Sequence, residues 1–303
     1  MTLAHEHVFT LTVDSQQQWS DEWDEEARVA DAIEKLTALR ATGVRTIVDP
    51  TVDGLGRNVP RVRRINEKVP DLNILVATGI YTYADVPGFF AARGPGGLPG
   101  LPEVMTPLFV RDLTEGVQGT AVKAAFLKCA IDHHGLTDGV ERIMRSCAQA
   151  ALETGRPMMV HTHPRNRTGL DVQRVLAEEG LGPERVLLAH SGDSTDADHL
   201  SELAEAGFLL GMDRFGIDTI LAEDERIGIV VEMCRRGFAG SMVLSQDAAC
   251  YIDWVAPDLM PFLPNWHYEH ILTGVVPALL ERGVTQDQVD LMLIANPRRF
   301  FEQ

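Results

Sequence analysis

Cysteine is scarce in this sequence, and its spacing excludes two kinds of site. The 303 residues include only four cysteines, at positions 129, 147, 234 and 250, and no two of them form a Cys-x-x-Cys pair. Neither a disulfide framework nor a cysteine-liganded zinc site is therefore expected.

Long apolar runs and cationic residues are also scarce. No apolar run approaches the ~18–20 residues that span a bilayer, and no charged-then-apolar leader opens the chain, so we expect a soluble cytoplasmic protein. Lys and Arg number 27 against 44 Asp and Glu, which gives a formal charge of −17. Because this charge repels polyanions, neither nucleic acid nor an anionic membrane is an expected partner. Neutral or cationic small molecules remain possible substrates.

The sequence does contain a regular alternation of short apolar runs with longer amphipathic ones. Eight apolar runs predict buried parallel strands: Thr2–Phe9, Arg45–Pro50, Leu72–Tyr81, Ala124–Ile131, Pro157–Thr162, Arg185–Ser191, Phe208–Asp213 and Met242–Asp247. Helical patterns between them include Glu25–Thr42, Asp138–Glu153, Gly169–Glu179, Ala197–Ala206 and Glu223–Arg236. We therefore predict an α/β protein, a (β/α)8 TIM barrel formed by a single domain over residues 1–303.

His5, Glu6 and His7 lie inside the first predicted strand. Because successive side chains alternate across a strand, both imidazoles face one side and Glu6 faces the other. Two imidazoles turned toward a barrel interior indicate a divalent metal site. A pair of core histidines satisfied by hydrogen bonds is an equally weighted alternative.

Single ionisable residues occur near the ends of four other predicted strands. Lys128 interrupts the fourth strand, His161 and His190 end the fifth and sixth, and Asp247 ends the eighth. Such side chains are rarely buried unless they are paired or bind metal, and the carboxyl ends of barrel strands meet at one rim. Together with the first-strand histidines they predict a metal site there. An ammonium at Lys128 would repel metal ions, whereas a carbamate formed with carbon dioxide would be anionic; a salt bridge to a nearby carboxylate is the alternative.

The order of these residues along the strands resembles that of the binuclear amidohydrolase superfamily. Segments that resemble its phosphotriesterase family are Thr2-Leu3-Ala4-His5-Glu6-His7, Gly119-Thr120, His190-Ser191-Gly192-Asp193 and Asn296-Pro297. Segments that resemble the phosphotriesterase-like lactonases are Thr78-Gly79-Ile80-Tyr81-Thr82-Tyr83, Met212-Asp213-Arg214-Phe215-Gly216 and Cys250-Tyr251-Ile252-Asp253-Trp254. The resemblance covers nearly the whole chain.

The resemblance implies two divalent metal ions, zinc or else cobalt, iron or manganese, at the C-terminal face of the barrel strands. His5, His7 and Asp247 would hold the more buried ion, and His161 and His190 the more exposed one. Asp247 is also expected to act catalytically, as the group that passes a proton to the leaving oxygen of the substrate.

The resemblance further implies that Lys128 carries a carbamate that bridges the two ions. Tyr81 would lie beside the metals with a catalytic and substrate-binding role, and Arg214 and Trp254 would shape the substrate pocket. We also expect Cys250 to line this pocket, without acting as a nucleophile.

The expected activity is that of a lactonase. It would open N-acyl homoserine lactones, a quorum-quenching activity, with promiscuous phosphotriesterase activity. A dedicated phosphotriesterase or carboxylesterase on the same site is the first alternative, and a non-catalytic metal-binding barrel is the second. We expect the protein to form a homodimer and to bind a small-molecule lactone as its substrate.

Overall fold

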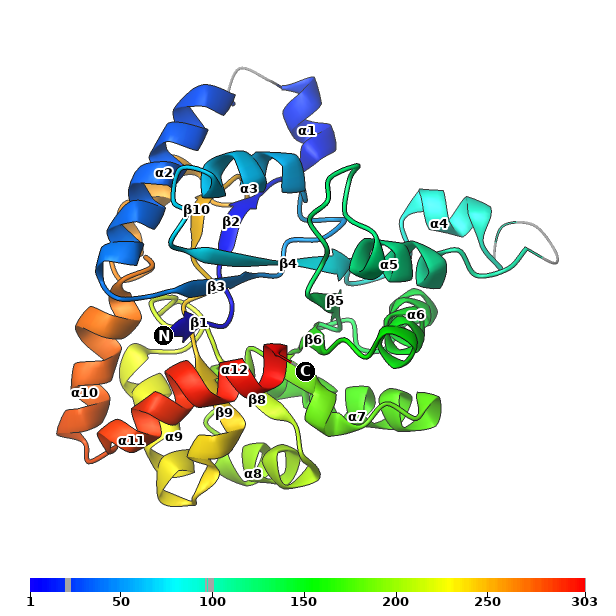
Figure 1. The fold of residues 1–303 in the computed structure, drawn as a ribbon. Helices are drawn as coiled ribbons and strands as arrows, with labels where there is room; N and C mark the ends of the chain where they lie inside the picture. The colour runs from blue at the N-terminus through cyan, green and yellow to red at the C-terminus, as the bar shows by residue number, and fades with distance from the viewer. Residues whose placement is uncertain (20–22, 96, 98–100, 303) are drawn as a thin grey trace.

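Eight parallel strands form a nearly closed barrel in the computed structural model, which describes residues 1–19, 23–95, 97 and 101–302 (Figure 1). Their order is β1 (Thr2–Leu3), β3 (Thr46–Asp49), β4 (Asn73–Gly79), β5 (Phe126–Ala130), β6 (Met158–His161), β7 (Val186–Ala189), β8 (Leu209–Met212) and β9 (Met242–Leu244). The predicted (β/α)8 fold is confirmed.

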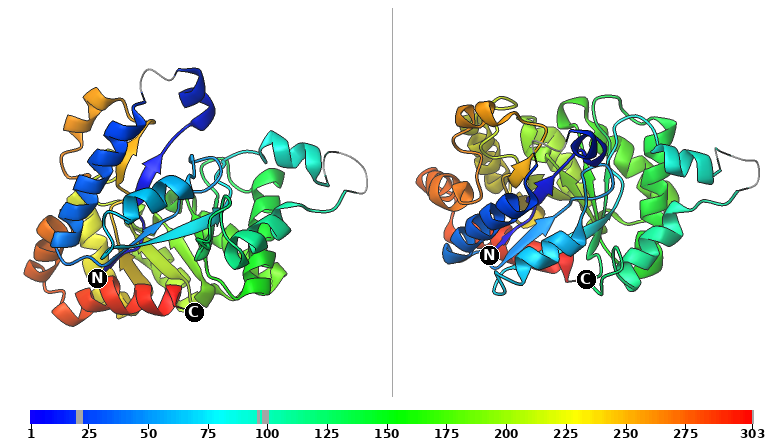
Figure 2. Two further views of the ribbon diagram at one scale, coloured as in Figure 1. Left: turned by 45° about the horizontal axis from the view of Figure 1, so that its top comes forward. Right: turned by 90° about the horizontal axis from the view of Figure 1, so that it is seen from above.

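Helices between the strands cover the outside of the barrel (Figure 2). These are α2 (Glu25–Ala41), α3 (Val59–Asn66), α5 (Met105–Thr114), α6 (Asp138–Thr154), α7 (Thr168–Glu179), α8 (Ala197–Ala206) and α9 (Glu223–Arg235). Three short helices, α10 (Val276–Glu281), α11 (Gln286–Asp290) and α12 (Asn296–Phe301), follow, while α1 (Val13–Gln18) and α4 (Gly88–Arg93) project away from the strands. No described helix combines the length and apolarity needed to cross a membrane.

Local sequence signals account for the helix boundaries that the sequence predicts best. The α6 helix begins where the Thr137 side chain accepts a hydrogen bond from the amide of Val140, and it ends at Gly155, whose φ of 75° is left-handed. The α8 helix has the same design, with Asp196 at its start and Gly207 at its end. Such signals place both helices within one residue of the predicted bounds.

The seam of the barrel, between its first and last strands, differs from the prediction. The expected strand Thr2–Phe9 is interrupted, and β2 (His7–Thr10) pairs instead with β10 (Ala249–Ile252), a strand that the sequence analysis did not predict. The buried Glu6 carboxylate explains the interruption: it accepts hydrogen bonds from the Ser245 hydroxyl and from the amides of Gln246 and Ala248, at 2.6–2.9 Å. These bonds join the two ends of the barrel where ladder pairing is missing.

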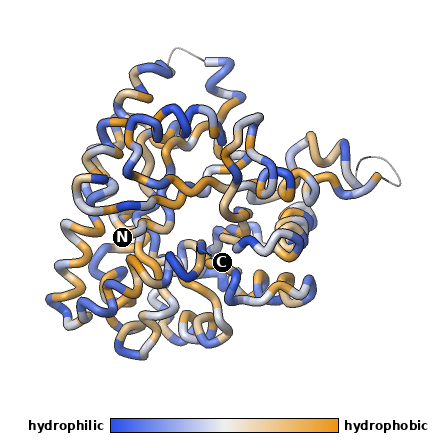
Figure 3. Tube along the Cα trace, viewed as in Figure 1, coloured by the Kyte–Doolittle hydropathy of each residue, from blue (hydrophilic) through white to orange (hydrophobic). Residues whose placement is uncertain are grey.

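The two ends of the barrel interior differ in chemistry, whereas hydrophobic and hydrophilic residues alternate along the outer helices (Figure 3). The end nearer the termini is filled by apolar side chains, including Val48, Ala77, Phe126, Met159, Leu187, Leu209, Val243 and Phe300. Helix α12 closes this end: the Phe301 ring lies 5.4 Å from that of Phe126, and the Asn296 amide donates to the carbonyl oxygens of Ala239 and Met242. Buried ionisable side chains therefore gather toward the opposite end, where the strands terminate.

Candidate metal centre

His5 and His7 converge on Asp247 across the seam. Their Nε2 atoms lie 3.3 Å and 3.2 Å from Oδ1 of Asp247, and both imidazoles are buried. Two ligand atoms that each lie ~2.05 Å from a tetrahedral zinc ion are ~3.3 Å apart. The three side chains thus have the separations of ligands to a common ion, and Glu6 lies on the other side of the chain as the alternation predicts.

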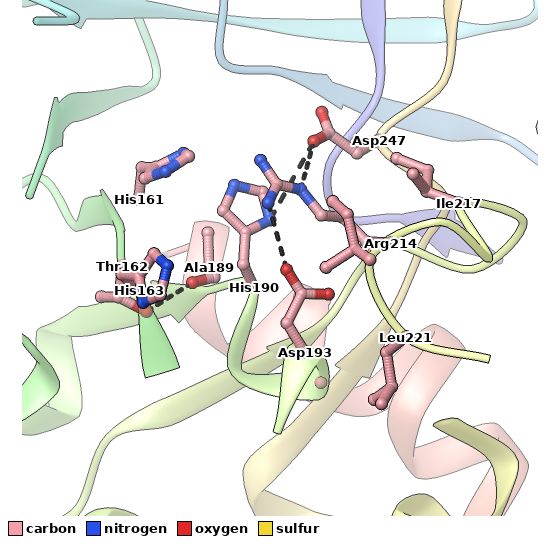
Figure 4. A network of polar contacts seen from close by, with 12 residues as sticks. His161, Thr162, His163, Ala189, His190, Asp193, Arg214, Ile217, Leu221 and Asp247 are labelled. Carbon is pink, nitrogen blue, oxygen red and sulfur yellow. Dashed lines mark hydrogen bonds and ion pairs between the residues drawn. The ribbon is translucent and has the colours of Figure 1, made fainter. Parts of the chain in front are cut away.

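The other two predicted histidines pack beside them. The ring centroid of His190 lies 4.4 Å from that of His161 and 4.9 Å from that of His5. Figure 4 shows His161 and His190 next to Arg214 and Asp247. The structure therefore brings the histidines of β6 and β7 to the same place as those of the first strand.

Lys128 completes the cluster from β5. Its side chain is buried, and its Nζ atom has no hydrogen-bond partner among the described residues, so the salt bridge considered as an alternative is not present there. An unpaired buried ammonium is strongly unfavourable. The orphaned Nζ atom is the observation that most directly indicates a missing anionic or metal-linked group at this position.

All six predicted ligands line one cavity of about 210 Å³. The predicted pocket residues Tyr81, Arg214 and Trp254 line it as well. The Tyr81 hydroxyl is 3.4 Å from Nδ1 of His161, and the Tyr81 ring is 6.0 Å from that of Trp254. Arg214 donates to Asp247 at 3.0 Å.

Cys250 is the exception, and its predicted placement is wrong. Its thiol lies 3.1 Å from the hydroxyl of Tyr268 and lines an adjoining cavity of about 420 Å³ rather than the one that contains the histidines. Burial raises the pKa of this thiol to about 12, so it is not a nucleophile. The reason is the unpredicted strand β10, which packs Cys250 against Tyr268.

Two carboxylates that the sequence analysis did not single out orient the histidines. Asp213 is fully buried and contacts Nδ1 of His5 at 2.8 Å and Nδ1 of His190 at 3.0 Å. Asp132 makes a short contact with Nε2 of His161. Asp213 directly follows β8 and Asp132 lies two residues beyond the end of β5, so the signal that identified Asp247 was present for both. Such partners fix the tautomer of a ligating histidine and leave its other nitrogen for the metal.

The electrostatics of the cluster favour a cation. Burial lowers the pKa of His161 to about 4 and that of Lys128 to about 8, so the imidazole is neutral and the amine loses its proton readily. Burial alone would raise the pKa of Asp247, but the nearby His5, His7 and Arg214 outweigh it and lower that pKa well below its ordinary value. A neutral nitrogen donor and an ionised carboxylate are the forms that bind metal.

The pKa of His7 also indicates that the cluster favours a positive charge. Burial lowers its pKa, but hydrogen bonds with Asp247 and Asp49 outweigh burial and raise it to about 9. The positive charge that a protonated His7 places beside Asp247 could therefore be supplied instead by a divalent cation. The nitrogen and oxygen donors of the cluster suit zinc, cobalt, iron or manganese.

Comparisons with known proteins agree with this geometry. The family model of the phosphotriesterase family matches residues 1–301. The chain belongs to the phosphotriesterase family. It is 52% identical over 305 residues to a phosphotriesterase homology protein of Mycobacterium tuberculosis, covering 100% of this chain and 93% of that protein.

A second relative and a solved structure extend the comparison. An aryldialkylphosphatase of Saccharolobus solfataricus is 35% identical over 303 residues, which cover 99% of this chain and 94% of that protein. The solved structure of the phosphotriesterase from Mycobacterium tuberculosis superposes with a TM-score of 0.97 at 53% identity, covering 99% of this chain and 93% of that one. This chain is therefore a phosphotriesterase-family hydrolase with the TIM-barrel fold of its relatives.

Proposed function

We propose that this phosphotriesterase-family hydrolase opens lactones, with N-acyl homoserine lactones as the substrate class. The observation that carries the proposal is the small volume of the cavity together with its lining residues. Its volume of about 210 Å³ is below the ~300–1,000 Å³ of pockets that enclose drug-sized ligands. It has an ionisable floor and apolar walls that include Leu55, Ile217, Ile220, Ile252 and Trp266. A compact lactone ring fits such a cavity better than a phosphorus atom with three bulky substituents.

The metal part of the proposal is two divalent ions. His5, His7 and Asp247 would hold one ion, and His161 and His190 would hold the other. When bound, the ions would supply Lewis-acid activation of water and of the ester carbonyl.

Lys128 would carry the bridging carbamate. Its neutral amine would attack carbon dioxide, forming an N–C bond and releasing one proton, to leave an anionic carbamate. The orphaned Nζ atom supports this assignment, since the carbamate would provide it with the partners that the described residues do not.

The side chains around the cavity would divide the proton transfers. Burial raises the pKa of the Tyr81 hydroxyl well above its usual value, so Tyr81 would stay protonated and donate a hydrogen bond to the substrate oxygen. Asp247 would stay ionised, accept the proton of the attacking water and pass it to the leaving ring oxygen. Arg214, which donates to Oδ2 of Asp247, would hold the carboxylate in place for both transfers.

The acyl chain would extend along the apolar wall toward Trp254. The Trp254 side chain is 46% exposed, and exposed Leu259 and Phe262 follow it in the chain. Each methylene buried there would contribute up to ~0.8 kcal/mol, so kcat/KM should rise with acyl length until the wall is covered.

Phosphotriester hydrolysis is the second candidate, favoured by the relative described as an aryldialkylphosphatase. One experiment separates the candidates: zinc- or cobalt-loaded protein is assayed in parallel with acyl homoserine lactones of increasing chain length and with paraoxon. We expect lactone efficiency to exceed paraoxon efficiency by orders of magnitude. Equal or higher efficiency on paraoxon, with no dependence on acyl length, would assign the enzyme to phosphotriesters, and inactivity on both would support a non-catalytic barrel.

A further inference from the structure

A chain of alternating charges leads from the candidate site into the protein. Oδ2 of Asp247 accepts from Nε of Arg214 at 3.0 Å, and Nη1 of Arg214 donates to Oδ2 of Asp193 at 3.1 Å (Figure 4). The other oxygen of Asp193, Oδ1, accepts from Nη1 of Arg226 at 2.5 Å. Asp193 therefore binds one guanidinium with each carboxylate oxygen.

Arg226 is the innermost member of this chain and has no part in the chemistry proposed above. It lies near the start of α9 and is only 2% exposed. Besides Asp193, it donates to the carbonyl oxygens of Leu221 at 3.1 Å, Gly192 at 3.2 Å and Ile217 at 3.4 Å. The planar guanidinium presents its donors in a fixed fork, so this one side chain holds acceptors from two separate loops together.

One of these loops forms a wall of the substrate cavity. The segment 213–222, which joins β8 to α9, contributes Arg214, Ile217 and Ile220 to the lining. The segment contains neither helix nor strand, and its internal hydrogen bonds run from the amide of Ile217 to Arg214 and from that of Ile220 to Ile217. Besides the amide of Phe215, which donates to Ser245, and the burial of Phe215 and Leu221, side-chain hydrogen bonds to its carbonyl oxygens help to fix it.

A second arginine holds the same segment from outside. Arg165 is exposed, and its guanidinium contacts the carbonyl oxygens of Ile220 and Asp193. The wall is thus held from a buried side by Arg226 and from a solvent side by Arg165. The buried clamp is the stronger, since buried acceptors that lose a charged donor have no water to replace it.

We propose that Arg226 is a positioning residue that sets the width of the substrate cavity without touching the substrate. It does so by fixing the backbone that carries Ile217 and Ile220, while Arg214 keeps its own hydrogen bonds to Asp247 and Asp193. The inference depends on the proposed function only in the choice of substrate for the kinetic assay.

The test compares Arg226→Met with a matched control on the same helix. Arg226→Met keeps the apolar stem and removes every donor, whereas Arg235→Met removes an exposed guanidinium whose partner among the described residues is Glu232. Three quantities are measured on metal-loaded protein: amide hydrogen exchange of residues 213–222, metal content, and KM and kcat for a series of acyl homoserine lactones. We expect Arg226→Met to speed exchange of the segment about tenfold.

The kinetic expectation separates positioning from general damage. KM for long-chain lactones should rise about tenfold while kcat stays within about threefold, since the reacting groups stay in place. Metal content and the global unfolding transition should match those of Arg235→Met. Arg226→Lys, with fewer donors, should give an intermediate exchange rate and KM.

Opposite outcomes overturn the proposal. Wild-type exchange and KM in Arg226→Met would show that the segment needs no clamp, and a fall in kcat with unchanged KM, or loss of metal, would assign Arg226 to the metal centre instead. If Arg226→Met does not fold, Arg226→Lys and the exposed Arg165→Met decide by the same readouts. If the wild-type protein hydrolyses no lactone, the proposed function fails, while the exchange measurement still decides whether Arg226 clamps the segment.

Discussion

Asp213→Asn would change a buried carboxylate that contacts one histidine of each proposed metal position. Asp213 accepts from Nδ1 of His5 at 2.8 Å, and from Nδ1 and the backbone amide of His190 at 3.0 Å and 2.8 Å. An asparagine has one acceptor oxygen in place of two. Its amide group would face one of the rings as a donor, and that histidine would change tautomer or lose its partner.

The structure sets the size of the expected effect. Loss of the partner that orients a ligating histidine weakens metal binding about 10–100-fold, or ~1.4–2.8 kcal/mol. Because Asp213 orients one histidine of each proposed ion, both ions should be affected, and loading of the pair should weaken by up to about 10⁴-fold. Asp132 contacts His161, a proposed ligand of one ion, so replacing Asp132 should weaken the binding of that ion only.

The assay is a zinc titration of apoprotein against a chromophoric chelator, with metal content measured after dialysis. Asp112→Asn is the control, because Asp112 is also buried but binds Arg57 and Thr78 and does not line the metal-site cavity. The control should lose stability and keep its zinc affinity. Wild-type zinc affinity in Asp213→Asn would refute the assignment of Asp213 as the shared orienting group.

Four further outcomes are expected. Prolonged chelation should abolish hydrolysis and added zinc or cobalt should restore it; well under two ions per active chain would contradict a binuclear centre. Lys128→Ala should lose most activity, with partial recovery in a short carboxylate buffer, and near-normal turnover and metal content would exclude a bridging role. Trp254→Ala should raise KM for long-chain lactones and leave short-chain KM and metal content unchanged, so a uniform loss across chain lengths would contradict its contact with the acyl chain. The pKa of Glu103 is lowered because hydrogen bonds, chiefly with Arg142, outweigh the effect of burial. The ionised carboxylate therefore stabilises the fold above its ordinary pKa of 4.5, and this stabilisation is lost as the pH falls. Glu103→Gln should reduce the dependence of Tm on pH between about pH 5 and 3, and an unchanged dependence would show that the pair has no such role.

The sequence was most informative where a buried strand ends in a charge. That one signal located His161, His190 and Asp247, because an ionisable side chain in an apolar run needs a partner. The same signal marked Asp132 and Asp213. Their function depends on which histidine nitrogen each carboxylate contacts, and the sequence does not give these contacts. Cys250 could not be placed because β10 exists only through its pairing with β2, a contact between residues about 240 positions apart in the chain.

The seam between the first and last barrel strands, where Glu6 binds, also determines when the candidate metal site can form during synthesis. Glu6 needs Ser245, Gln246 and Ala248 to satisfy its carboxylate, and His5 and His7 need Asp247. A nascent chain exposes residues 5–7 long before it reaches these partners, so these side chains wait unpaired while most of the barrel is made. The candidate metal centre is therefore absent from every translation intermediate that ends before residue 247. A cell that makes this protein therefore obtains its hydrolytic chemistry only after residue 247 has been made.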